Sequence, residues 1–150
     1  MSKFKPNDFL VYPGHGVGKV TRIETREILG SKQSMYAIEL IDSGMKLLVP
    51  CGATDTIGVR PVISRFEASR VKDILALPPS VQNQSWSVSY RLSMEKIKSG
   101  SIFEIAECIR DLRGLKDSKE LSFGERKMLD NAKTMLNREM SIVDPDWAIV

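Results

Sequence analysis

The sequence is poor in residues that bind metal ions, because its 150 residues include one histidine and two cysteines. The cysteines form no CxxC pair, so the usual zinc ligand sets cannot be assembled. No apolar run approaches the roughly 18 residues of a membrane-spanning helix, and no signal-peptide segment follows the N-terminus. We therefore expect a cytoplasmic protein with reduced thiols, no metal, no cofactor and no membrane association.

Motifs of common enzymes are also missing, since there is no Walker loop, GxGxxG, HExxH or GxSxG. The glycine-rich segment at 14–18 precedes a predicted strand, so it offers no helix N-terminus to a phosphate. A catalytic pair of His15 with Cys51 or Cys108 lacks a visible orienting group. These observations favour a binding role over catalysis, and we expect no enzyme.

The first part of the sequence has the pattern of short β-strands. Runs rich in β-branched and aromatic residues at 9–12, 17–28, 34–41 and 45–49 are separated by turn signals that contain glycine. This spacing predicts a small antiparallel barrel or curled sheet. Residues 54–63 are expected to form a loop and a short edge strand.

The second part has helical periodicity. Apolar residues at steps of three and four predict helices at 65–77, 86–98, 102–112 and 123–140. Three Ser-x-x-Glu capping boxes mark helix starts. They are Ser64 with Glu67, Ser101 with Glu104, and Ser122 with Glu125.

The two patterns predict an α+β chain of two domains, with a compact four-helix domain after the barrel. The expected boundaries are 1–63 for the β-rich domain, 64–143 for the helical domain and 144–150 for a loosely held tail that includes Trp147.

Trp86 opens a predicted helix after a polar segment, and two interpretations of it remain open. It shares a helix face with Tyr90 and Ile97, which is typical of core packing. An exposed indole at that position could instead act as an apolar wedge in a DNA minor groove. Arg91 and Lys96 could contact phosphates, although the net charge of +3 is small for a nucleic-acid-binding protein.

The sequence resembles the CarD/CdnL family of bacterial transcription regulators over residues 4–142, in colinear order. The segments that carry the resemblance are Phe4–Gly18, Ile23–Arg26, Gly44–Pro50, Gly58–Arg60, Trp86–Ser101, Glu104–Leu112 and Leu121–Leu129.

The resemblance implies a Tudor-like (SH3-like) barrel that binds the RNA polymerase β subunit. It also implies a helical domain that contacts promoter DNA at the upstream edge of the transcription bubble, without reading base sequence, and stabilises the open complex. The expected polymerase-binding residues are Arg26, Ile38, Leu48 and Pro50. The expected DNA-binding residues are Trp86 as the minor-groove wedge, Arg91, Lys96, Arg126 and Lys127. We expect a monomer that reaches the nucleoid through the polymerase.

The sequence departs from the family pattern at two places. Ser87-Val88-Ser89 replaces a stretch that is often basic, which predicts weaker DNA affinity and a flatter salt dependence. Leu48 replaces an arginine of some relatives and predicts a more apolar polymerase contact. A protein-only adaptor, whose helical domain recruits another protein to the polymerase, is the alternative.

Overall fold

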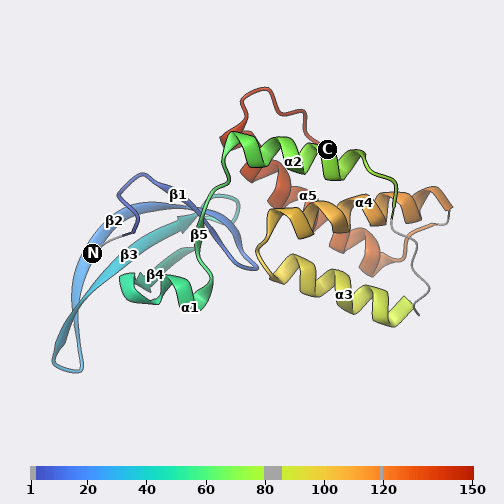
Figure 1. Ribbon diagram of the computed structural model, residues 1–150. Coiled ribbons are helices and arrows are strands. Elements are labelled where there is room, and N and C mark those ends of the chain that lie inside the picture. Colours follow the sequence, from blue (N-terminus) through green and yellow to red (C-terminus); the bar gives the residue numbers. More distant parts are fainter. Residues whose placement is uncertain (1–2, 80–85, 119) are drawn as a thin grey trace. The chain divides into compact units, whose positions relative to one another are not determined.

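The structure is a computed structural model that describes residues 3–79, 86–118 and 120–150; for 86–89 and 118 it describes the backbone alone (Figure 1). The chain divides into two compact units, Met1–Val62 and Ile63–Val150. The first unit is β-rich and the second is helical, so the predicted α+β class is confirmed.

The first unit is a five-stranded antiparallel sheet in the order β4-β3-β2-β1-β5. The strands are β1 (Phe9–Tyr12), β2 (Gly16–Ile28), β3 (Ser31–Leu40), β4 (Lys46–Pro50) and β5 (Arg60–Pro61). The predicted edge strand is thus present as β5. A 3₁₀ turn (Cys51–Ala53) and a short helix, α1 (Thr54–Ile57), precede it. The prediction of a loop is therefore wrong for residues 54–57, which form α1. Helix α1 ends at Gly58, whose φ of 91° is the left-handed conformation that glycine adopts without strain.

One face of the sheet forms the apolar core of this unit. At its centre Tyr36 is fully buried, and its hydroxyl accepts a hydrogen bond from the Phe4 backbone N–H at 3.0 Å. The buried residues of this core are Phe4, Leu10, Val20, Tyr36, Ile38, Val49 and Val59.

A β-bulge at Thr21 decides which side chains of β2 face this core. The pairing register with β3 shifts between Val20 and Arg22, and the Thr21 hydroxyl donates a hydrogen bond to the Ala37 carbonyl at 3.1 Å. The extra residue lets both Val20 and Ile23 pack on the core side. Arg22 and the alternate residues after it consequently lie on the opposite face.

The second unit contains four helices: α2 (Arg65–Ala76), α3 (Trp86–Lys98), α4 (Ile102–Ser118) and α5 (Phe123–Val143). Complete capping boxes start α2 at Ser64 and α5 at Ser122, as predicted. The buried core is built from their apolar faces, with Val71, Ile109 and Leu136 at 0% exposure. The start of this unit is fixed to α5, because the carboxylate of Glu139 accepts a hydrogen bond from the Ile63 N–H at 2.9 Å.

Helix α4 continues past its predicted end at Leu112 to Ser118. Gly114, which lowers helix propensity, lies inside this extension. The ring of Pro79 occupies the space that a Cβ at position 114 would need. Glycine at this position therefore allows the segment after α2 to pack directly on α4.

The expectation of a loosely held tail is wrong. Trp147 and Val150 pack against the helical core, and the Trp147 indole N–H donates a hydrogen bond to the Asn137 side chain at 3.0 Å. Lys72 of α2 also forms an ion pair with Asp144 at 2.6 Å. These contacts lie outside the periodic apolar faces of the helices, so apolar periodicity does not predict them.

Candidate interaction surfaces

The face of the first sheet that points away from its core gathers several predicted binding residues. Across strands β2, β3 and β4, the register aligns Glu24 with Met35 and Pro50. It likewise aligns Arg22 with Ala37 and Leu48. Residues directly opposite one another share a face of a sheet. We call this surface the outer face. Its members are Arg22, Glu24, Arg26, Leu48 and Pro50, together with Met35 and Ala37, which are 7% and 6% exposed and lie beneath the others.

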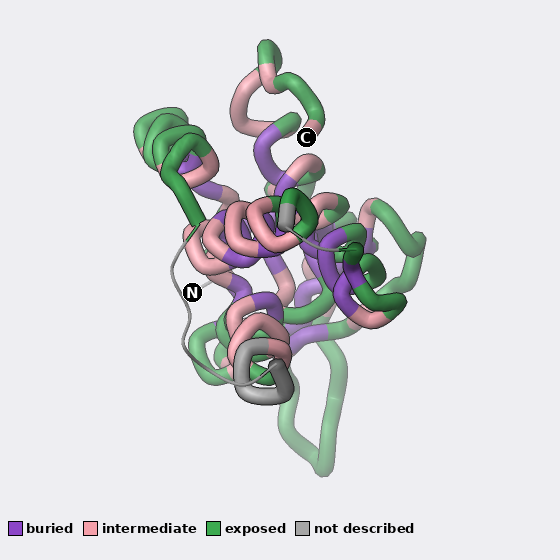
Figure 2. Tube along the Cα trace, turned by 90° about the vertical axis from the view of Figure 1, so that its right-hand side faces the viewer, coloured by how far each residue is buried: buried purple, intermediate pink, exposed green. Residues whose placement is uncertain are grey.

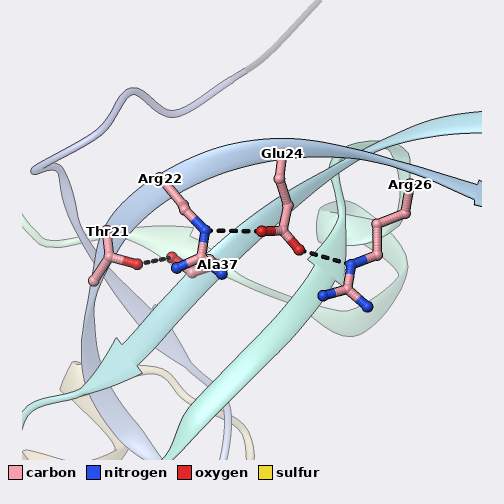
Figure 3. Close-up of polar contacts among 5 residues, drawn as sticks. All are labelled: Thr21, Arg22, Glu24, Arg26 and Ala37. Carbon is pink, nitrogen blue, oxygen red and sulfur yellow. Dashed lines mark hydrogen bonds and ion pairs between the residues drawn. The ribbon is translucent and has the colours of Figure 1, made fainter.

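Charge on the outer face is organised around Glu24 (Figure 3). Its carboxylate accepts a hydrogen bond from Arg22 Nε at 2.8 Å and from Arg26 Nε at 2.7 Å. These hydrogen bonds hold the pKa of Glu24 below its usual value, and the bond from Arg26 has the largest effect. The carboxylate therefore remains ionised and keeps the two guanidinium groups in line along β2, with a net charge of +1.

Apolar atoms and a hollow lie beside these charges. Leu48 is 41% exposed, although it is apolar and sits in a strand. A cavity of about 360 Å³ is lined by Leu48 and Lys46 of β4, by Ala37 of β3, and by Arg22 of β2. Since β3 lies between the other two strands, the small side chain of Ala37 leaves the hollow open.

Ile38 is the predicted polymerase-binding residue whose side chain lies on the core side of the sheet. It is 1% exposed and belongs to the core of the sheet. Successive side chains of a strand point to opposite faces, so Ile38 faces away from its neighbour Ala37. Its side chain therefore supports the outer face from behind, and its role as a contact residue stays a prediction, since Ile38 also helps to line the cavity beside this face.

Sequence analysis missed four members of the outer face: Arg22, Glu24, Met35 and Ala37. The strict alternation of β3 identifies Met35 and Ala37 once Ile38 is assigned to the core. No sequence signal located the bulge at Thr21, which places Arg22 on the same face as Glu24 and Arg26.

The predicted DNA-binding residues lie on α3 and α5. Trp86 is the first residue of α3, but its side chain lies outside the described residues. Arg91, Arg126 and Lys127 are exposed. The Tyr90 ring lies beside Gly124, where a Cβ would be 3.4 Å from it, so the start of α5 packs against the second turn of α3. The three exposed cations among the predicted DNA-binding residues therefore lie on α3 and α5, in segments that pack against each other.

Lys96 differs from these cations because its ammonium group forms an ion pair with Glu107 of α4 at 3.1 Å. Both side chains are partly exposed, at 31% and 37%. The pair connects α3 to α4, and a phosphate would have to compete with Glu107 for the ammonium group. The role of Lys96 as a DNA contact stays a prediction, and it requires this ion pair to open.

Two family models match the chain in sequence order. The model described as CarD-like/TRCF RID domain matches residues 4–63, and the model described as CarD, C-terminal domain matches residues 70–145. The chain belongs to the CarD/CdnL family. The predicted fold, a Tudor-like N-terminal domain followed by a helical C-terminal domain, is therefore confirmed, and membership gives the chain a role in transcription regulation.

The chain is similar to one relative over most of its length and to two solved structures over part of it. "Putative transcription factor YdeB" of Bacillus subtilis (strain 168) is 35% identical over 140 residues, which cover 93% of this chain and 92% of that protein. CdnLNt of Myxococcus xanthus, a solved structure, is 38% identical and covers 43% of this chain and 92% of that chain, with a TM-score of 0.36. The 72-residue N-terminal domain of Myxococcus xanthus CarD is 31% identical and covers 41% of this chain and 81% of that chain, with a TM-score of 0.35.

The part of this CarD/CdnL chain that the structure describes contains no cluster of three or more His, Cys, Asp or Glu residues able to hold a metal ion. Among the same described residues, no helix has the length and apolar character needed to cross a bilayer.

Proposed function

We propose that this CarD/CdnL protein binds the RNA polymerase β subunit through the outer face of its sheet. Its helical unit then contacts promoter DNA at the upstream edge of the transcription bubble and stabilises the open complex. Trp86 acts as a wedge in the minor groove, while Arg91, Arg126 and Lys127 contact phosphates. The contact with DNA reads no base sequence.

The observation that carries the proposal is the composition of the outer face. This face contains three of the expected polymerase-binding residues, Arg26, Leu48 and Pro50. In the strand register, Leu48 is opposite Ala37 and Pro50 is opposite Met35, and both of these β3 residues pair with β2. An exposed leucine beside a row of ordered arginines is typical of a protein-binding surface, in which an apolar centre has a charged rim.

The DNA contact is proposed to be weak by itself. Residues 87–89, directly after Trp86, include no cation, and Lys96 is paired with Glu107. Tethering to the polymerase raises the local concentration of the helical unit at the duplex, so a few phosphate contacts and one indole suffice.

The same observations favour one alternative, a protein-only adaptor. In that case the β-rich unit still binds the polymerase, but the surface around the start of α3 recruits another protein. The alternative predicts that the position of Trp86 is close to protein rather than DNA in the assembled complex.

The polymerase contact is tested by recovery of the full chain with RNA polymerase. Leu48→Asp places a carboxylate at the exposed apolar position of the outer face and is expected to abolish recovery. Met45→Asp is the matched control, because Met45 is also exposed, at 48% against 41% for Leu48, and lies outside the outer face. Equal recovery of the two variants would contradict the proposed surface.

The DNA contact is tested by photo-crosslinking from position 86 in the polymerase–promoter complex. Crosslinks to DNA upstream of the bubble support the wedge, whereas crosslinks to protein alone support the adaptor. Trp86→Ala is expected to keep polymerase binding and to shorten the lifetime of the open complex. An unchanged lifetime would refute the wedge role.

A further inference from the structure

Helix α2 has one buried side and one side that the described part of the chain leaves uncovered. Ala68 and Val71 are 3% and 0% exposed and face the core of the second unit, where α2 packs against α4 and α5. Figure 2 shows α2 at the upper left, mostly green, with purple only on the side toward the other helices. At about 100° per helical residue, four exposed residues lie within about 60° of one another on the opposite side. We call them the α2 stripe; they are Phe66, Arg70, Asp73 and Leu77.

The two ends of the α2 stripe are apolar. Phe66, in the first turn, is 75% exposed, and Leu77, directly after the helix, is 53% exposed. At a rise of about 1.5 Å per residue, the two residues are about 16 Å apart along the helix axis. Exposure of both side chains to water is unfavourable, and burial against an apolar partner relieves it.

Two opposite charges lie between these apolar ends. Arg70 and Asp73 are both exposed. The Arg70 guanidinium lies over the Phe103 ring of α4, 5.0 Å from its centroid, and this cation–π contact orients the side chain. Because a guanidinium has several donors, Arg70 can bind a carboxylate while it keeps this contact. The α2 stripe therefore presents one cation and one anion and has no net charge.

The order of these residues makes the α2 stripe complementary to a second copy of itself. Phe66 and Leu77 have the same midpoint along the helix as Arg70 and Asp73. When two α2 helices lie antiparallel about a two-fold axis at this midpoint, each phenylalanine is opposite a leucine and each arginine is opposite an aspartate. Apolar ends thus meet apolar ends, and opposite charges meet between them.

We propose that α2 forms an antiparallel, two-fold symmetric contact with α2 of a second copy of this chain through the α2 stripe. A nucleic acid fits this surface less well, because the stripe has no net charge and Asp73 repels phosphates. A contact of four side chains per copy is smaller than the roughly 1,200 Å² of a stable interface, so the dimer is weak. The monomer expected from the sequence is then the form at low concentration. The inference goes beyond the proposed function and does not depend on it, since the α2 stripe contains no residue assigned to polymerase or DNA binding.

Sedimentation equilibrium of the full chain, from micromolar to millimolar concentration, tests the proposal. The average mass is expected to rise toward that of a dimer, and a monomer mass throughout would overturn the proposal. Arg70→Asp and Asp73→Arg each place like charges opposite one another and are each expected to weaken dimerisation at least about tenfold. The double variant exchanges the two charges and is expected to restore dimerisation. Failure of the double variant to recover would refute the antiparallel pairing.

Arg65→Asp is the matched control for the charge substitutions. Arg65 is exposed on the same helix but lies about 100° from Phe66, outside the α2 stripe, so dimerisation is expected to be unchanged. A loss equal to that of Arg70→Asp would show a general effect of charge and contradict the proposal. Phe66→Ser is expected to weaken dimerisation and to leave recovery with RNA polymerase unchanged. If Phe66→Ser instead lowers only the recovery with polymerase, the α2 stripe binds the polymerase and the proposal is overturned.

Discussion

Asn137 of α5 holds the indole of Trp147, because its Oδ1 accepts a hydrogen bond from Nε1 at 3.0 Å. The same oxygen accepts the Val150 N–H at 3.1 Å, and the Asn137 Nδ2 donates to the Val150 carbonyl at 3.2 Å. One side chain therefore satisfies three polar groups of the segment after α5. The indole packs against the core that α2, α4 and α5 share.

Asn137→Ala is expected to lower the free energy of unfolding by about 1–3 kcal/mol, because it leaves these partners without their hydrogen bonds. In a Trp86→Phe background, the fluorescence of Trp147 is also expected to shift to longer wavelength as the indole becomes more hydrated. Chemical denaturation and emission spectra measure the two effects. Asn131→Ala, an exposed asparagine on the same helix, is the control; equal stabilities would contradict this role.

Local signals in the sequence predicted the elements well. The capping boxes at Ser64 and Ser122 involve residues only three positions apart, so their hydrogen bonds form wherever the helix forms. The turn at Gly44 is also a local feature, because its φ of 74° requires a glycine in the turn and no distant partner.

Features that depend on distant partners were not predictable in this way. Trp147 is held by Asn137, and Gly114 inside α4 leaves the room that the Pro79 ring occupies. Ile38 was assigned to the surface from the family resemblance, whereas the register with β4 shows that it faces the core. Each of these outcomes depends on tertiary contacts that periodicity does not report.

Gly114→Ala is expected to destabilise the helical unit by about 1–3 kcal/mol, even though alanine is the better helix former. The added Cβ would overlap the Pro79 ring, so Pro79 or the helix must move. Gly124→Ala is the matched control, because its Cβ would lie 3.4 Å from Tyr90, an ordinary contact. Thermal denaturation of both variants tests the difference, and a stable Gly114→Ala protein would show that the Pro79 contact is dispensable.

Cys108 is expected to be unreactive in the folded protein. It is 1% exposed, and burial raises the pKa of its thiol to about 11. Because an unfolded cysteine has a pKa of about 8.5, the folded state retains this proton to higher pH. The stabilisation by Cys108 is therefore complete below about pH 8.5 and is lost as the pH rises toward 11.

Two measurements check this expectation in a Cys51→Ser background. Iodoacetamide should modify Cys108 at pH 9 only under denaturing conditions. The stability difference between this protein and its Cys108→Ala derivative should shrink between pH 8.5 and pH 11. Rapid alkylation of the native protein would show that the thiol is not buried as described.

The exposed cations of α5 should determine how strongly salt weakens the DNA contact. Each neutralised phosphate contributes about 0.9 to the slope of log affinity against log salt concentration. Arg126→Gln and Lys127→Gln are each expected to flatten the slope by about this amount, measured with polymerase-bound protein on promoter DNA. Lys96→Gln is the comparison, since its ammonium group is already 3.1 Å from Glu107 and should change the slope little. If Lys96→Gln flattens the slope as much as Lys127→Gln does, the ion pair opens on DNA and Lys96 is a phosphate contact after all.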